Sequence, residues 1–302
     1  MTISPTYRFI RVLQYTWKMD LLIFFSCVMV YYVDTYIIER FFILPPIIPT
    51  VLGPAIAFFV GFNNNQAYDR WWEARKIWGA LVNDSRTWAR NVLCYVIPAE
   101  DDTQTELMKQ QMVKRHIAFI YALKTALRPQ NDVTYRKYLS DEELGLIESH
   151  SNMHNAVLLL QSRDLETLSR MGYIDGFRYL ELNKMLVAFT DSMGMAERIK
   201  NTVFPTIYIF FTKAFIWLFT IMITMVCSRE IGLWSIVMGS IVGSVFHITH
   251  FNGQTLMDPF STLTTSMPLN QISRTIEINL LEMLGEKDIP APVKPINNEY
   301  VM

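Results

Sequence analysis

Four long apolar segments constrain the fold of this chain more than any other feature of its sequence. They come in two pairs, at residues 21–33 and 41–62 and then at residues 203–227 and 231–246. A helix of about 20 mostly apolar residues is needed to cross the hydrocarbon core of a bilayer. The third segment meets that length outright, whereas the first and last need their aromatic and polar flanks to complete a crossing. With 51% hydrophobic residues overall, the pattern predicts an all-α membrane protein with about four transmembrane helices.

Prolines interrupt the second apolar segment. Pro45, Pro46, Pro49 and Pro54 all lie within it, and proline removes a backbone donor and disturbs a helix interior. We therefore expect the first half of this segment not to be regular helix. Irregular backbone at membrane depth is stable only where protein or a water-filled cavity surrounds it.

Basic residues predict how the segments are oriented. Arg8, Arg11 and Lys18 precede the first segment, several Lys and Arg follow the second, and the two short hairpin loops hold Arg40 and Arg229. Because cytoplasmic loops are enriched in Lys and Arg, both termini and the middle of the chain are predicted to be cytosolic. The predicted parts are a cytosolic N-terminal segment (1–20), a first membrane pair (21–62), a cytosolic helical domain (63–201), a second membrane pair (202–252) and a cytosolic C-terminal segment (253–302).

Signals of other protein classes are weak. The net charge of −1 gives no indication of nucleic-acid binding. Cys27, Cys94 and Cys227 are far apart and form no CxxC pair, so neither a disulfide framework nor a zinc site is predicted. His150 and His154 have the spacing of metal ligands on a helix, but no third ligand accompanies them, so we interpret them as a solvated helix face. No catalytic, metal or cofactor site is predicted, because the sequence has no GxSxG, Walker or GxGxxG motif.

Polar residues within the second pair of apolar segments have two possible interpretations. Lys213 lies inside the third segment, where a charge should either face protein or water in a functional role, or snorkel or pair within the bundle. His247 and His250 end the fourth segment, where a structural role is favoured over a catalytic one. Gly239 and Gly243 belong to a pattern of small residues that predicts a close contact between helices.

The end of the second apolar segment carries the most informative pattern. Phe58 and Phe62 are four residues apart on one face of a helix, and Pro54 lies one turn earlier. A polar run that begins with Asn63 and Asn64 follows directly. Two interpretations fit equally well. One is a narrow apolar constriction that opens into a polar vestibule at these asparagines, and the other is a lipid-facing stripe followed by a polar helix exit.

A longer motif around this point resembles a known family. The stretch GFNNNQAYDRWWEARKIWG, at residues 61–79, closely resembles the signature of the bacterial bestrophin homologues, and its RWW triplet matches that of the animal bestrophins. The resemblance covers most of the chain, from about Tyr15 to Leu281. It extends to residues in several later segments, namely Asp175, Pro205, Tyr208 and Asp258-Pro259-Phe260.

The resemblance implies a bestrophin-like pentameric channel. Each subunit would contribute four membrane helices and a large helical cytosolic domain, and the second membrane helix would line a hydrophobic neck of the central pore. The three pore-facing rows of that neck fall on Pro54, Phe58 and Phe62, although Pro54 departs from the aliphatic or aromatic residues that the family carries there. A second constriction, the cytosolic aperture, falls on Phe177.

Calcium dependence is not expected. In the animal proteins an acidic run after the Asn-Pro-Phe segment helps to bind calcium, but here the corresponding residues are Ser261–Thr265. Calcium takes six to eight oxygen ligands, usually including several carboxylates. Uncharged hydroxyl groups are a poor replacement, so the resemblance and this departure together predict opening without calcium.

The resulting hypothesis is a passive ion channel of the cell membrane, inner or plasma, that assembles from copies of itself in the lipid bilayer. Chloride is favoured, because the electropositive edges of aromatic rings would line the neck. A sodium- or potassium-conducting channel of the same fold and a non-conducting membrane scaffold are the alternatives. A membrane enzyme is disfavoured by the absent motifs.

Overall fold

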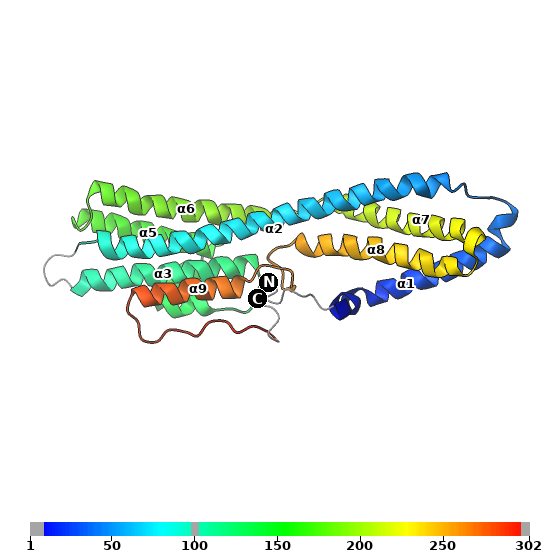
Figure 1. Cartoon of the computed structure of the whole chain (residues 1–302). Helices are drawn as coiled ribbons and strands as arrows, with labels where there is room; N and C mark the ends of the chain where they lie inside the picture. The colour runs from blue at the N-terminus through cyan, green and yellow to red at the C-terminus, as the bar shows by residue number, and fades with distance from the viewer. Residues whose placement is uncertain (1–8, 98–102, 297–302) are drawn as a thin grey trace. The chain divides into compact units, whose positions relative to one another are not determined.

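The computed structural model describes residues 9–97 and 103–296. Arg8, which contributes to the predicted orientation, lies outside these residues. Within them the chain is helical and contains no β-strand (Figure 1). In chain order the elements are α1 (Phe9–Tyr36), the short 3₁₀-helix η1 (Ile38–Arg40), α2 (Ile47–Tyr95), α3 (Thr103–Leu127), the 3₁₀-helix η2 (Thr134–Tyr138), α4 (Asp141–Glu148), α5 (Met153–Arg170), α6 (Gly176–Asn201), α7 (Thr206–Ile231), α8 (Trp234–Leu256) and α9 (Leu269–Met283).

The described residues form two compact units. The first, here called the membrane unit, contains the residues up to Trp71 and Val203–Asp258, and the second, the helical unit, contains Trp72–Thr202 and the residues from Pro259 onward. In the described part of the chain four helical segments are long and apolar enough to cross a membrane, which confirms the prediction of an all-α membrane protein. These segments are Gln14–Arg40, Ile47–Tyr95, Thr206–Ile231 and Trp234–Leu256.

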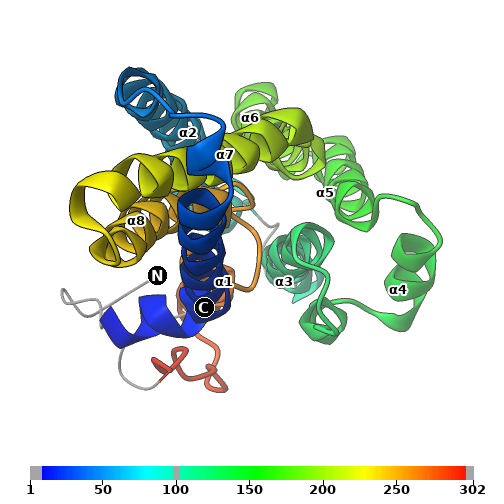
Figure 2. The same cartoon turned by 90° about the vertical axis from the view of Figure 1, so that its right-hand side faces the viewer.

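Small residues bring the helices of the membrane unit close together. Helices α1, α7 and α8 pack against one another and lie side by side in both views (Figures 1 and 2). A Cβ atom on Gly243 would lie only 2.8 Å from the Thr220 side chain and 2.9 Å from Ile23, and Gly239 faces the Thr224 side chain in the same way. The predicted close contact at these two glycines is therefore confirmed.

The proline-rich segment is more regular than expected. The backbone is irregular only up to Pro46, and α2 begins at Ile47. Pro49 lies in the first turn, where a backbone N–H would have no helical partner and a proline is tolerated. Pro54 lies inside the helix. The expectation that the first half of this segment is not regular helix thus holds for residues 41–46 and is wrong from Ile47 onward, because three of the four prolines lie before the helix or in its first turn.

The helical unit is built around a buried aromatic cluster. The His116 ring lies 4.2 Å from the Phe189 ring and 5.6 Å from the Phe119 ring, measured between centroids. Trp88 completes the cluster at 6.0 Å from Phe189. The His116 Nε2 atom lies 2.8 Å from the Ser85 hydroxyl. Burial lowers the pKa of His116 to about 3, so this ring is a neutral core residue.

A buried carboxylate attaches α9 to α3 and η2. Glu277 of α9 is 1% exposed. Its oxygens accept hydrogen bonds from the Tyr121 hydroxyl at 2.5 Å and from the Tyr138 hydroxyl, and Arg274 approaches it at 3.1 Å. Burial, and then the hydrogen bond to Glu277, raises the pKa of both tyrosines. Both phenols are therefore neutral donors that compensate the buried charge.

The two histidines singled out for their spacing do not share a helix. His150 lies in the bend between α4 and α5, where its Nδ1 atom is 2.7 Å from the Leu146 carbonyl oxygen. His154 is in the first turn of α5, and its Nε2 atom lies 2.6 Å from Glu197. Their interpretation as one solvated helix face is wrong, because the Asn152 side chain caps α5 and starts the helix after His150.

Candidate functional site

The membrane part of α2 has one face that packs inside the subunit. Ile56 and Val60 are 3% and 2% exposed and form an apolar cluster with Ile216 and Phe219 of α7. Gly53 allows this approach, since a Cβ atom there would lie 3.2 Å from the Phe219 ring. The spacing of three to four residues between these buried positions fixes the rotation of α2 about its axis.

The opposite face of α2 is exposed and apolar. It carries the three residues assigned to the neck, and Phe58 and Phe62 expose 71% and 49% of their surface, while Pro54 is also exposed. Four residues advance a helix by about 40° beyond a full turn, so the three side chains form one slowly turning row. We call this row, Pro54, Phe58 and Phe62, the neck face. Large apolar side chains gathered on one exposed helix face are typical of an interaction surface or a membrane contact.

Phe59 lies beside the neck face but belongs to a different surface. Its ring lines an apolar groove with residues of the first three turns of α7, including Tyr208 and Phe215. Its ring centroid is 6.2 Å from that of Phe58, in an edge-on arrangement. Phe59 therefore resembles Phe58 in chemistry and depth but packs toward α7, which makes it a natural control for experiments on the neck face.

Asn63 and Asn64 attach α2 to its neighbours within the membrane unit. Asn63 is 1% exposed, and its amide donates a hydrogen bond to the Thr212 hydroxyl of α7 at 3.0 Å. The Asn64 amide donates to the Thr249 carbonyl oxygen of α8 at 3.0 Å and occupies the space that a side chain on Gly253 would need. In the single chain these two amides are thus engaged inside the unit, so their assignment to a vestibule stays a prediction.

The neck face continues into residues that the sequence pattern could have identified. Asn65 and Asp69 are both exposed, and each is within about 60° of the preceding member of the row in an ideal helix. The signal was the same helical period that grouped Phe58 with Phe62. The apolar row therefore passes into an amide and then a carboxylate on one side of α2.

Phe177, assigned to the cytosolic aperture, lies in the helical unit. It is the second residue of α6 and is 84% exposed. Asp175 caps this helix, because its carboxylate accepts a hydrogen bond from the Arg178 backbone N–H at 2.8 Å. A capped first turn holds the exposed ring at a defined point of the unit, and its role in an aperture remains a prediction.

The segment that corresponds to the animal calcium site is organised by protein groups. The Arg128 guanidinium donates to the carbonyl oxygens of Phe260 and Met267, at 2.7 Å and 2.8 Å, and the hydroxyls of Ser261 and Ser266 contact each other. A guanidinium that occupies the carbonyl oxygens on both sides of this segment, together with a donor set of hydroxyl groups, does not fit a calcium ion. In the described ranges no group of three or more His, Cys, Asp or Glu residues could hold a metal ion.

Known proteins share this architecture. A family model described as Bacterial/Fungal Bestrophin protein matches residues 10–282. The voltage-dependent anion channel-forming protein YneE of Salmonella typhi is 32% identical over 244 residues, which cover 80% of this chain and 78% of that protein. The protein of the same name from Escherichia coli strain K12 is 30% identical and covers 82% of this chain and 79% of its own length.

A solved structure agrees with the sequence relatives. The crystal structure of a bacterial bestrophin homolog from Klebsiella pneumoniae matches with a TM-score of 0.81 and 26% identity, covering 88% of this chain and 97% of that chain. The family model spans most of the sequence, and it includes the motif at residues 61–79 and all of the helices except the first residue of α1 and the last residue of α9. The resemblance inferred from that motif is thereby confirmed, and the chain belongs to the bacterial and fungal bestrophin family.

Proposed function

We propose that this protein is the subunit of a passive anion channel, with chloride as the favoured ion, and that the neck face of α2 lines its pore in a homopentamer. The observation that carries the proposal is the exposure of Phe58 and Phe62 on one side of a helix whose other side is buried. The names of the relatives, which describe voltage-dependent anion channel formation, support it.

The chemistry of the neck face suits a gate. Five copies of Phe58 and of Phe62 around an axis would form two apolar rings, and such linings offer water no hydrogen bonds. Hydrophobic constrictions of this kind can close a pore by dewetting. The ring edges carry partial positive charge, which favours an anion over a cation where no formal charge is present.

The rest of the pathway follows from the exposed residues. Beyond the apolar rings Asn65 would form an exposed polar ring beside the vestibule assigned to Asn63 and Asn64, and Phe177 would form the second constriction. Both termini and the helical unit would lie in the cytosol, and the membrane unit would span the cell membrane. Transport through such a pathway needs no catalytic group or cofactor.

Substitutions on α2 test the proposal. Purified protein in liposomes should conduct ions, and Phe58→Ala and Phe62→Ala should each raise the single-channel conductance, because a smaller side chain widens the ring and lets water enter. Phe59→Ala should remove packing against α7 without that gain, and because the ring is 42% exposed it should cost less than the about 3–5 kcal/mol typical of a fully buried phenylalanine. Equal conductance in all three variants would end the assignment of the neck.

A sodium- or potassium-conducting channel is the second candidate, and one observation favours it. Asp69 places a carboxylate on the same exposed side of α2 as the neck face, and a ring of such charges would attract cations. The sign of the reversal potential in asymmetric potassium chloride separates the two candidates. Vesicles that pass no ions, from protein that is pentameric by native mass spectrometry, would instead indicate a scaffold.

A further inference from the structure

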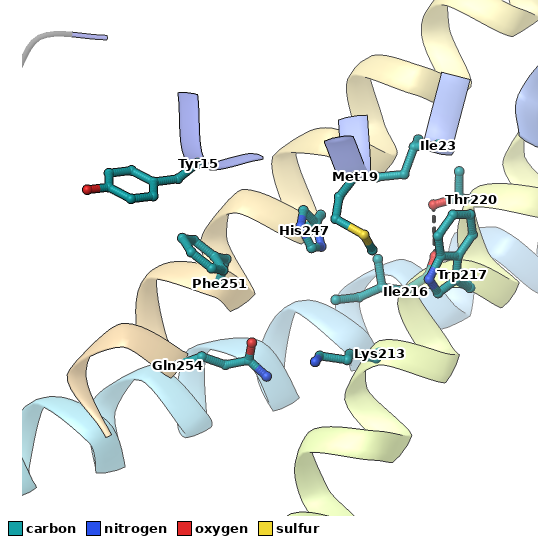
Figure 3. Close-up of a pocket in the computed structure, with 10 residues that line it drawn as sticks. All are labelled: Tyr15, Met19, Ile23, Lys213, Ile216, Trp217, Thr220, His247, Phe251 and Gln254. Atoms are coloured by element: carbon teal, nitrogen blue, oxygen red, sulfur yellow. Dashed lines mark hydrogen bonds between the residues drawn. The ribbon is translucent and has the colours of Figure 1, made fainter. Parts of the chain in front are cut away.

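The membrane unit contains a pocket that has no part in the neck face. It lies between α1, α7 and α8 and has a volume of about 240 Å³. Figure 3 shows that its side chains come from all three helices and that Lys213 of α7 and Gln254 of α8 point toward each other across it. His247 of α8 borders the same space (Figure 3). The pocket thus gathers a cation and two further polar groups inside the membrane unit.

Lys213 is the notable member of this group. It is exposed, and it forms no hydrogen bond or ion pair with any residue that the structure describes. A lysine in a membrane-spanning helix normally faces water, reaches the interface, or pairs with another group. Among the described residues Lys213 therefore does not pair within the bundle, and its charge is available to a ligand.

Other ionisable groups surround this lysine. His250 is 1% exposed, and neither of its ring nitrogens has a hydrogen-bond partner, while it interacts electrostatically with both Lys213 and His247. The negative charge of Asp20 on α1 attracts His247 electrostatically. One oxygen of Asp20 accepts a hydrogen bond from the Thr16 hydroxyl at 2.7 Å. One carboxylate, that of Asp20, therefore lies near His247.

The remaining walls of the pocket are apolar. Ile216 and Trp217 line it beside Lys213, Ile23 lines it farther along, and Phe251 and Tyr15 line it beside His247. A ligand that satisfies both parts of this lining must carry an anionic head and an apolar body. A small hydrated anion would use only the polar groups and would leave the apolar walls in contact with water.

The depth of the pocket agrees with such a ligand. Lys213 is seven residues after the first residue of α7, Thr206, which places it about 10 Å along the helix axis from that end. The predicted orientation puts this end of α7 on the cytosolic side. The ammonium group can therefore reach the phosphate level of the cytosolic leaflet, while the apolar walls lie at the level of the acyl chains.

We propose that this pocket binds an anionic phospholipid of the cytosolic leaflet, with Lys213 holding the headgroup phosphate. His247 and Gln254 donate hydrogen bonds to the same headgroup, and the apolar walls contact the first part of an acyl chain. The site does not depend on which ion the protein conducts or on the neck face. Only the choice of leaflet rests on the predicted orientation.

Lipid retention in native mass spectrometry tests the proposal. Detergent-solubilised protein should retain added dioleoyl phosphatidylglycerol but not dioleoyl phosphatidylcholine, which has the same acyl chains and no net charge. Phosphatidylglycerol should also raise the thermal unfolding temperature, whereas inorganic phosphate should not. If inorganic phosphate raised the unfolding temperature as much as phosphatidylglycerol does, the site would be assigned to a free anion and the proposal of a lipid ligand would be overturned.

Charge variants provide the matched controls. Lys213→Gln should weaken phosphatidylglycerol retention by about tenfold, the effect of losing one charge-assisted hydrogen bond, and Lys213→Arg should restore it. Lys18→Gln removes the same charge from an exposed position on α1 outside the pocket and should leave retention unchanged. Equal retention of both lipids, or equal retention in Lys213→Gln and the wild type, would overturn the proposal, whether or not the protein conducts ions.

Discussion

The membrane unit and the helical unit bury polar side chains in different ways. In the membrane unit the partners are close in sequence or uncharged. The hydroxyls of Thr220 and Thr224 each donate to the carbonyl oxygen four residues earlier, at 2.8 Å. The buried carboxylate of Asp34 accepts a hydrogen bond from the Ser228 hydroxyl at 2.6 Å. The described part of this unit thus compensates its buried polar groups mainly with hydroxyls.

The helical unit uses hydroxyls at Glu277 as well, but it also compensates buried charge with opposite charge, in part from distant parts of the chain. Arg115 of α3 pairs with both Glu143 of α4 and Asp164 of α5. Burial raises the pKa of Asp164 to about 6, against the lowering effect of Arg115, and Glu143 adds to the rise. Lys124 pairs with Asp132 in the same unit. One guanidinium therefore connects three helices.

This difference indicates where each unit depends on its surroundings. The helical unit pairs several of its buried charges internally and exposes fewer large apolar side chains than the membrane unit. The membrane unit satisfies its few polar groups locally and leaves large apolar side chains exposed, including those of the neck face. Lipid and further copies of the chain are the partners that such a surface needs. Assembly and lipid binding are thus expected to depend mainly on the membrane unit.

Breaking the charge network of the helical unit should give the largest loss of stability. Arg115→Leu leaves Glu143 and Asp164 buried without their cation, and removal of one partner from a buried pair typically costs about 3–5 kcal/mol. Thermal unfolding in detergent measures the change. Arg170→Leu breaks the exposed pair with Glu166 and should cost less than about 1 kcal/mol. Equal losses in the two variants would show that the network contributes no more than a surface pair.

Crowding the helix contact of the membrane unit should have a smaller effect. Gly243→Ala puts a methyl group against Thr220 and Ile23, and such overpacking typically costs about 1–3 kcal/mol. Gly194→Ala is the matched control in the helical unit, because Gly194 is exposed in α6 with no atom within 4 Å of its added Cβ. That control should stabilise the protein by about 0.5–1 kcal/mol. A stabilising Gly243→Ala would mean that the three helices pack less closely than described.

Local sequence properties predicted most of the fold. Hydropathy is a property of short segments, so the four membrane helices could be read from the chain. The end of α3 at Leu127 also follows locally, from Pro129 and the residue before it. The start of α5 could have been placed correctly from Asn152, a favourable helix-capping residue. The error at His150 therefore reflects an overlooked cap and not a missing signal.

Other features depend on contacts that no local pattern contains. Arg115 and its two carboxylates are separated by 28 and 49 residues, and nothing in the sequence relates them. The neck face lies between these two cases, because it is only partly predictable from local sequence. Its spacing is local, but only the packing of Ile56 and Val60 on α7 shows that this face is the exposed one. The same rotation turns Asn63 inward and Asn65 outward. Because both are asparagines only two residues apart, their identity alone does not show which of them is exposed.

Asp69 should have the smallest but most specific effect. It lies seven residues after Phe62 on the exposed side of α2, about 10 Å farther along the helix axis. In a pentamer its carboxylates would form a ring that lowers the local concentration of anions and raises that of cations at the exit of the neck. This charge opposes the preference expected from the phenylalanine rings. It would therefore limit anion selectivity without contributing to the apolar gate.

Asp69→Asn distinguishes the effect of the charge at the exit of the neck from the effect of the apolar rings on ion selectivity. The variant should move the reversal potential in asymmetric potassium chloride toward the chloride equilibrium potential. The shift should be larger at low ionic strength, because screening weakens the ring as salt rises. Glu230→Gln removes the same charge from an exposed position near the end of α7 and should leave the reversal potential unchanged. An equal shift in both variants would indicate a general surface-charge effect, and no shift in either would place Asp69 outside the ion pathway.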